Sequence, residues 1–317
     1  MKRNFSLDVA RGLLAWAIVG VHCVWLTGHG GPIQHQVGVW TVIAFVAMSG
    51  YVIALSLSRR QEPYLDFLWR RLSRLLPVFL ACLALSLALR PWTIGSAPAE
   101  AIRELYETRY YPAQICAHLS LLYGAIPDTL LPGTAEAFLP PAWCITLEFQ
   151  LYLLAPLALY ILRKDKWTVT TLVMLASGLL LFRPFSGPLA HYWGETGAFF
   201  LQRLFFFLLG MLFAVYPAWG TVFRFADKIR YPSFLRYLGA LSYSVFLVHW
   251  PILACLNSLF SSIRDDMPVD LYATLLFASG TPFILLGAVL LYEYVEKPGN
   301  TLGCLLINRR SAALEPS

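Results

Sequence analysis

Two histidines occupy apolar stretches of the chain, where a titratable side chain is energetically costly. His22 lies in an apolar run that begins near Gly12, and His249 lies about halfway along a second run. Ionisable side chains within membrane-spanning segments are rare and mark functional sites. Because imidazole titrates near neutral pH, His22 could take a proton from a hydroxyl as a general base, and His249 is a second candidate acid or base. A structural hydrogen bond to a neighbouring helix is the alternative for both.

Arg11 lies eleven residues before His22. On an α-helix this spacing places the two side chains about 20° apart around the axis and about 16 Å apart along it, so both face the same way. We therefore expect His22 near the middle of a bilayer and Arg11 at its cytoplasmic edge, with Asp8 about one turn earlier. Taken alone, Arg11 is most simply an interfacial anchor.

A second basic pair, Arg71 and Arg74, is three residues apart and shares one face of a helix. Two arginines that converge at a membrane edge can bind a phosphate group bidentately. Topology signalling and contact with anionic lipid headgroups are the alternative interpretation of this pair.

A carboxylate, Glu148, lies with Gln150 in the first turns of another apolar run. A carboxylate in that position must face a cavity or pair with a cation. It could polarise a histidine, hold an arginine or bind a sugar hydroxyl, and the spacing does not choose among these roles.

The composition places all of these residues in a membrane protein. Hydrophobic residues make up 58% of the 317 and charged residues 13%, whereas soluble domains carry about a quarter charged residues. The six cysteines show no CxxC spacing, so the sequence predicts neither a metal site nor a disulfide framework. The net charge of +6 comes from basic residues at the edges of apolar runs, which indicates membrane topology and not nucleic-acid binding.

The predicted fold is an all-α bundle of eight to ten transmembrane helices. A spanning helix needs about 20 apolar residues. Eight runs approach that length: 12–28, 37–57, 72–90, 143–162, 167–183, 197–217, 237–259 and 271–294. Region 91–142 could be a re-entrant pair, one or two short helices or an outer loop. If it crosses the membrane it crosses twice, which gives ten spans, the number that we favour.

The distribution of basic residues orients this bundle. With the N-terminus in the cytoplasm, all but six of the 24 Lys and Arg residues fall on the cytoplasmic side, as the positive-inside rule requires. Both termini are then cytoplasmic. The first apolar run has no clean small-x-small cleavage site and is expected to remain as a helix. We expect one transmembrane domain over 1–300, a short cytoplasmic tail over 301–317 and no appended soluble domain.

Six short motifs, taken together and in order, resemble the acyltransferase-3 family of membrane proteins. In chain order they are Leu7-Asp8-x-x-Arg11-Gly12 with His22, Phe45 to Tyr51 with Ser49-Gly50, Arg71-Leu72-Ser73-Arg74 with Pro77, Trp143 to Tyr152, Leu241 to Pro251, and Glu296-Lys297-Pro298. They extend across some 290 residues of the chain. Two departures stand out: Cys144 occupies a position where serine is usual, and Phe149 one where many members carry a second acid.

The resemblance implies an enzyme that moves an acyl group, commonly acetyl, from cytoplasmic acyl-CoA to a hydroxyl of an extracytoplasmic carbohydrate or glycolipid. It implies a bacterial plasma membrane, acyl-CoA as donor substrate and no permanently bound cofactor or metal. His22, Arg11 and Glu148 would be catalytic, and Arg71 and Arg74 would bind the donor phosphates. The expected substrate-binding and supporting residues are Asp8, Ser49, Tyr51, Trp143, Gln150, Tyr152, Tyr243 and His249.

Two other functions fit parts of the pattern. A transporter or flippase also carries polar residues within its spans, although no inverted repeat is visible. A membrane glycosyltransferase or polysaccharide polymerase is the other alternative, with region 91–142 as its outer catalytic loop.

Overall fold

The structure is a computed structural model. In the part of the chain that it describes, all regular secondary structure is helical, and turns and loops connect the helices. The described residues are 5–29, 31–59, 62–93, 110–164, 168–179, 191–192, 198–216 and 231–314. An all-helical chain satisfies its backbone hydrogen bonds within each segment, which lipid requires.

Within these residues, six helical segments are long and apolar enough to cross a membrane. They are α1 (Phe5–Trp25), α2 (Pro32–Arg59), α3 (Tyr64–Thr93), α6 (Trp143–Lys164) with the preceding turn Pro140–Ala142, α11 (Ser233–Leu259), and the continuous segment Val269–Arg309. The last segment combines α13 (Val269–Leu291), a π-helical turn (Tyr292–Glu296) and most of α14 (Lys297–Leu314). The multi-pass membrane class is therefore confirmed, whereas eight to ten spans are not.

Two of the expected spans contain short helices in the part of the chain that the structure describes. Helices α7 (Thr168–Leu179) and α9 (Leu204–Val215) have 12 residues each, and a bilayer needs about 20. The run 197–217 is interrupted at Arg203, where a 3₁₀ turn (Phe200–Gln202) ends and α9 begins. Residues 167 and 180–183 of the other run, 167–183, lie outside the described part.

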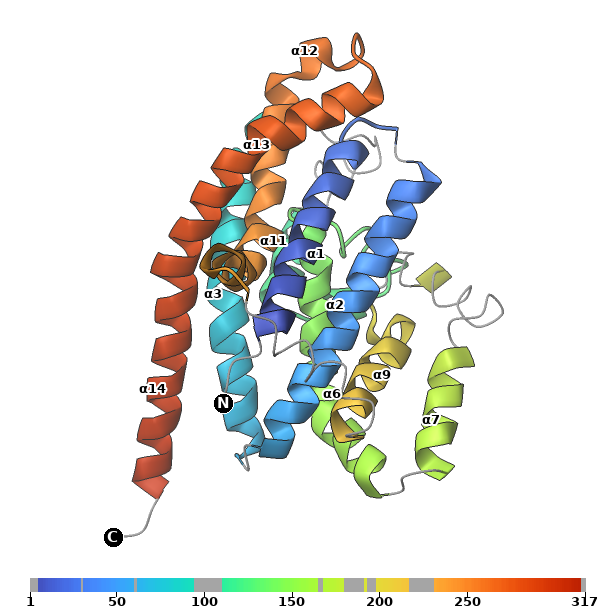
Figure 1. Cartoon of the computed structure of the whole chain (residues 1–317), viewed down its shortest axis with the longest axis vertical. Helices are drawn as coiled ribbons and strands as arrows, with labels where there is room; N and C mark the ends of the chain where they lie inside the picture. The colour runs from blue at the N-terminus through green and yellow to red at the C-terminus, as the bar shows by residue number, and fades with distance from the viewer. Residues whose placement is uncertain are drawn as a thin grey trace.

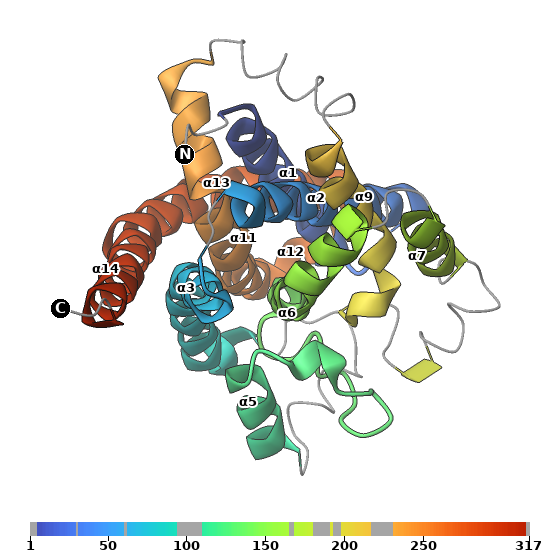
Figure 2. The same ribbon diagram turned by 90° about the horizontal axis from the view of Figure 1, so that it is seen from below.

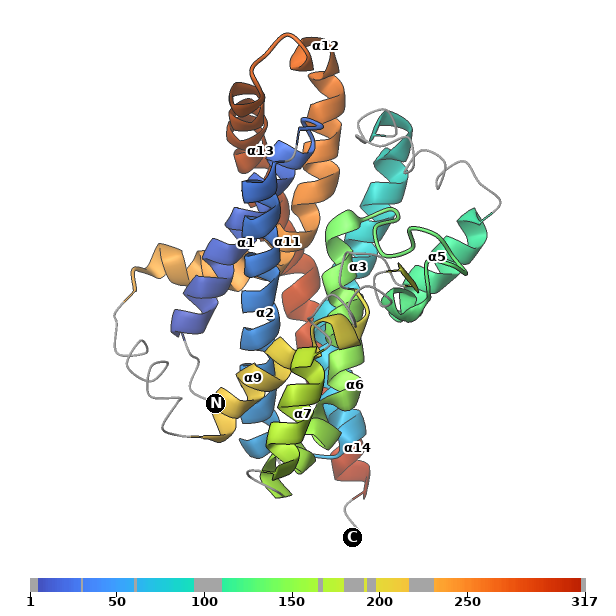
Figure 3. The same cartoon turned by 90° about the vertical axis from the view of Figure 1, so that its right-hand side faces the viewer.

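Region 91–142 contains no spanning helix in its described part. Helix α3 continues to Thr93, and after residues 94–109, which are outside the description, the chain forms the nine-residue α5 (Tyr111–Leu119). Two 3₁₀ turns follow, Tyr123–Ala125 and Pro140–Ala142. Tyr123, Leu139 and Ala142 are fully buried, so this segment packs into the bundle beside the start of α6 (Figure 3).

Small residues allow the helices that carry the candidate site to approach closely. A Cβ on Gly12 of α1 would lie 3.1 Å from the Cα atom of Gly239 of α11. Gly50 of α2 and Gly210 of α9 likewise contact the backbone of the partner helix. Close approach through small residues is the usual way in which helices associate in lipid, and it places α1 beside α11 and α2 beside α9 (Figure 1).

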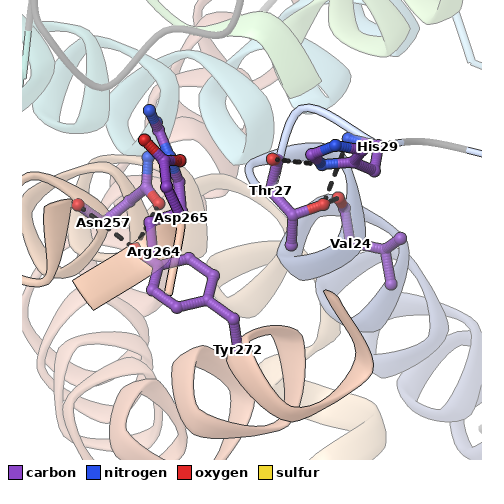
Figure 4. A network of polar contacts seen from close by, with 7 residues as sticks. All are labelled: Val24, Thr27, His29, Asn257, Arg264, Asp265 and Tyr272. Atoms are coloured by element: carbon purple, nitrogen blue, oxygen red, sulfur yellow. Dashed lines mark hydrogen bonds and ion pairs between the residues drawn. The ribbon is translucent and has the colours of Figure 1, made fainter. Parts of the chain in front are cut away.

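Seen from below, α2, α3, α6 and α11 surround the middle of the molecule, while α7 and α14 lie at its periphery (Figure 2). Polar contacts fix the far ends of α1, α11 and α13 (Figure 4). There the Tyr272 hydroxyl donates to Asn257 Oδ1 at 2.8 Å, which ties α13 to α11, and Thr27 caps the end of α1 through the Val24 carbonyl at 2.7 Å. The first contact joins α13 to the helix that carries His249, and the second is local to the end of the helix that carries His22.

Candidate active site

Five helices enclose a cavity that we call the arginine cavity. Its empty space is about 840 Å³, counting the part that is open to the surroundings. It is lined by Arg11 of α1, Val42, Phe45, Val46, Ser49, Val52 and Ile53 of α2, Arg71, Arg74 and Leu75 of α3, Cys144, Ile145, Leu147, Glu148 and Tyr152 of α6, and Ser242, Tyr243 and Phe246 of α11.

Three guanidinium groups and one carboxylate line the arginine cavity, so its charge is predominantly positive. Arg71 lies over the rings of Phe67 and Tyr152, with its Cζ atom 5.6 Å from each centroid. Its Nε atom is buried without a hydrogen-bond partner among the described residues. A buried donor that lacks a partner is costly, and an anionic ligand in the cavity would satisfy it.

Arg74 forms an ion pair with Glu296. The Arg74 Nε atom lies 3.8 Å from Glu296 Oε1, and the Ser244 hydroxyl donates to Glu296 Oε2 at 2.9 Å. Glu296 is 5% exposed and ends the π-helical turn between α13 and α14. Such turns often occur at functional sites because they displace one side chain from the regular helical register.

Two tyrosine hydroxyl groups form hydrogen bonds at the arginine cavity. The Tyr152 hydroxyl donates to Glu148 Oε2 at 2.7 Å from one turn further along α6. The Tyr243 hydroxyl donates to the Leu75 carbonyl at 2.6 Å, which connects α11 to α3. Glu148 is therefore oriented toward a cavity that also contains Arg11, Arg71 and Arg74.

A second cavity, which we call the histidine cavity, adjoins the first. Its empty space is about 1260 Å³, again including its opening. It is lined by Ile18, Val21, His22 and Trp25 of α1, Gly31 and Gln34, His35, Gly38, Val39 and Val42 of α2, Glu136, Pro140, Pro141, Trp143 and Cys144 around the start of α6, Arg203, and Phe246 and Trp250 of α11. Val42, Cys144 and Phe246 line both cavities, and we call this shared wall the junction.

His22 and His249 form a hydrogen-bonded chain that fixes the tautomer of each ring. His249 Nδ1 lies 3.1 Å from the Val245 carbonyl oxygen, which can only accept, so His249 Nδ1 carries a proton. His249 Nε2 is then an acceptor, and His22 Nδ1–H donates to it at 2.8 Å. The remaining nitrogen of His22, Nε2, therefore has a free lone pair, on a ring that lines the histidine cavity.

The structure gathers most of the predicted site residues around the two cavities. Arg11, Ser49, Arg71, Arg74, Glu148, Tyr152 and Tyr243 line the arginine cavity. His22 and Trp143 line the histidine cavity, and His249 is fully buried behind His22. The expectation that Arg11 and His22 share one side of their helix agrees with these positions.

Besides His249, three predicted site residues lie outside both linings: Asp8, Tyr51 and Gln150. Gln150 is buried; its amide group donates to the Ala198 carbonyl at 3.0 Å and accepts from the Phe200 amide at 3.2 Å. Tyr51 packs against Leu7 in a small apolar cluster. These contacts connect segments of the bundle.

The sequence reasoning gave no role to several residues that the structure places at the site. Glu296 belongs to a recognised motif, but nothing local showed that it reaches Arg74. Cys144 departs from the family motif, but the sequence assigns it no role at a cavity. No local pattern marks Phe246 of the junction. Arg203 is an ionisable residue within the apolar run 197–217, which marks it as a candidate, whereas Glu136 lies in region 91–142, where no clear pattern assigns it a role. Among the residues that the structure describes, no three His, Cys, Asp or Glu side chains are close enough to hold a metal ion.

Comparisons with known proteins identify the class. The sequence profile of the acyltransferase-3 family, described as "Acyltransferase domain", matches residues 4–230. The chain is 27% identical over 341 aligned residues to a protein of Komagataeibacter xylinus named as membrane-bound transacylase BcsY, with 89% of this chain and 82% of that protein covered. It is 25% identical over 189 residues to the O-acetyl transferase of Shigella phage Sf6, with 56% of this chain and 52% of that protein covered. No solved structure matches.

Because the family profile covers well over half of the chain, the protein belongs to the acyltransferase-3 family. It is thus a multi-pass membrane enzyme that transfers acyl groups other than amino-acyl groups.

Proposed function

We propose that this enzyme transfers an acyl group, most readily acetyl, from acyl-CoA in the arginine cavity to a hydroxyl group in the histidine cavity. The acceptor is an extracytoplasmic carbohydrate or glycolipid. One observation carries the proposal: a cationic cavity and a cavity with an unprotonated imidazole nitrogen share the junction of Val42, Cys144 and Phe246. Only the acyl group has to pass from one cavity to the other.

The arginine cavity suits the phosphates of coenzyme A. Arg11, Arg71 and Arg74 converge from two helices, and guanidinium groups bind phosphate oxygens in pairs. The basic residues around the arginines support a cytoplasmic position for this cavity by the positive-inside rule, with both termini on the same side. A bacterial plasma membrane would then separate the donor from the acceptor.

His22 acts on the acceptor. Its Nε2 atom takes the proton of the acceptor hydroxyl while the hydroxyl oxygen attacks the thioester carbonyl carbon. The carbon–sulfur bond breaks, and the coenzyme A thiolate leaves and takes up the proton. If Nε2 instead attacks the thioester, a transient acyl-histidine precedes transfer to the same hydroxyl. In both routes His249 positions the ring, because it accepts from His22 Nδ1 and keeps Nε2 unprotonated.

Loss of His22 tests the proposal. His22→Ala should abolish acylation of the cell's glycans while the protein remains folded in the membrane. His29→Ala is the matched control, since the hydrogen bonds of His29 to described residues lie within its own turn near Thr27. Mass spectrometry of glycans from deletion and complemented strains would show the mass of one acyl group lost and restored. Normal acylation with His22→Ala would refute the assignment.

The same experiment with labelled acyl-CoA separates this function from a transporter or flippase. An acyltransferase attaches the label covalently to glycan, whereas a transporter moves its substrate unchanged.

A further inference from the structure

The histidine cavity has aromatic walls around the His22 ring. The ring centroids of Trp25 and Trp250 are 5.4 Å apart and inclined at 52°, and His22 meets Trp250 edge-on at 5.6 Å. Trp143 lines the same cavity from the start of α6. Indole faces bind the C–H-bearing faces of sugar rings, and their N–H groups reach polar partners. Three tryptophans beside a general base therefore form a surface that suits a ring with many hydroxyl groups.

One cationic and one anionic side chain also line this cavity. They are Arg203, which directly precedes α9, and Glu136, which precedes the 3₁₀ turn Pro140–Ala142. The Arg203 Nε atom is buried with no hydrogen-bond partner, and no ion pair joins it to Glu136, within the part of the chain that the structure describes. Burial, and secondarily Asp128, raises the pKa of Glu136. The Arg203 Nη1 group donates to the Gln202 carbonyl at 3.5 Å, so the Arg203 Nε–H group and the Glu136 carboxyl group remain available for a ligand.

The charge of the histidine cavity differs from that of the arginine cavity. The arginine cavity has three arginines and one glutamate, whereas the histidine cavity has one of each. A site for a phosphate or carboxylate would be expected to carry excess positive charge. A balanced pair offers donors and an acceptor to hydroxyl groups instead.

We infer that the histidine cavity binds an uncharged pyranose residue, with Trp25 and Trp250 against the ring and Arg203 and Glu136 bound to its hydroxyl groups. The orientation of this sugar toward His22 rests on the proposed function, but its binding does not require catalysis. Arg203 and Glu136 then determine which acceptor is used, and the arginine cavity determines the donor.

Saturation-transfer NMR on the purified full-length protein in detergent tests binding directly. The probes are methyl glucopyranoside, methyl rhamnopyranoside and methyl glucuronide. At least one neutral glycoside should receive saturation on its ring C–H groups, and Arg203→Gln should weaken its binding about tenfold. Arg264→Gln is the control, because Arg264 pairs with Asp265 on the exposed turn after α11 and faces neither cavity. Binding of coenzyme A should be unchanged in both variants.

The possible outcomes test the sugar site and the proposed mechanism separately. Tighter binding of the glucuronide than of both neutral sugars, or equal binding by wild type and Arg203→Gln, would overturn the inference. If neutral sugars bind as expected but His22→Ala retains full transferase activity, the sugar site stands and the proposed mechanism fails. If transfer requires His22 but the KM for acceptor is the same in wild type and Arg203→Gln, the proposed function stands and this assignment fails.

Discussion

His22 Nδ1 lies 2.8 Å from His249 Nε2, although 227 residues separate them in the chain. The two rings are nearly parallel, at 14°, with centroids 5.1 Å apart. The Val245 carbonyl fixes the proton on the far side of His249. The pair therefore resembles a catalytic histidine with its orienting partner, in which a neutral imidazole occupies the place that a carboxylate often takes.

Replacement of His249 should lower the rate of transfer without weakening substrate binding. In His249→Ala the His22 ring loses its acceptor and can rotate or change tautomer, so we expect kcat to fall about 100-fold, within the range for general-base catalysis. The KM for acyl-CoA should change less than twofold. The double variant with His22→Ala should be no slower than His22→Ala alone, because the two residues act as a unit. An additive loss would contradict the positioning role.

The arginine pair of α3 should control donor affinity. Arg71→Gln or Arg74→Gln should raise the KM for acyl-CoA at least tenfold, since each loses charge-assisted bonds to phosphate. Arg70→Gln is the matched control: Arg70 pairs with Glu62 and does not line the cavity. Steady-state kinetics with varied acyl-CoA at fixed acceptor gives the measurement. Equal effects at positions 70 and 71 would indicate general surface charge and not a phosphate site.

Glu296 should position Arg74 for the donor. In Glu296→Gln the bond with Ser244 can persist while the ion pair with Arg74 is lost. We expect the KM for acyl-CoA to rise about fivefold with little change in kcat, because Arg74 gains conformational freedom. Isothermal titration with coenzyme A should show the same ratio. A tighter complex would mean that Glu296 competes with the donor for Arg74.

The junction should limit the length of the transferred acyl group. Phe246→Ala removes a large side chain from the wall shared by both cavities. We expect the preference for acetyl-CoA over butyryl-CoA to fall about tenfold, in line with the free energy of a few methylene groups in an apolar site. Phe283→Ala, at an exposed position on α13, is the control. An unchanged preference would place the acyl-length filter elsewhere.

His118 should make the stability of the fold depend on pH. Its ring is fully buried, stacks on Tyr123 at 4.2 Å and contacts the Gln114 carbonyl at 2.8 Å. Burial lowers the pKa of His118 to about 4, below the usual value of about 6.5. The unfolded chain therefore binds the proton more readily, and stability should decrease as pH falls from about 6.5 to about 4, by up to about 3 kcal/mol. Thermal unfolding of the detergent-solubilised protein should lose this dependence in His118→Gln.

The apolar runs of the sequence determined the class of protein and most of its helices. Helices α1, α2, α3, α6, α11 and α13 lie where long apolar stretches predict them, because lipid exposure leaves a strong compositional signal. The helical period also placed Arg11 and His22 on one side of α1. The predicted length of the span that contains α9 was wrong, because α9 begins at Leu204 after a 3₁₀ turn and composition alone does not show where a helix breaks. The run that contains α7 extends beyond the described residues.

Only the tertiary structure decided how these residues combine into a site. The approach of α1 and α11 at Gly12 and Gly239 brings His22 to His249, and the π-helical turn brings Glu296 to Arg74. Each pairing depends on the register and separation of two helices, which are set by packing across the whole bundle. A pattern within one helix shows which face carries a side chain, but not which side chain of another helix it will meet.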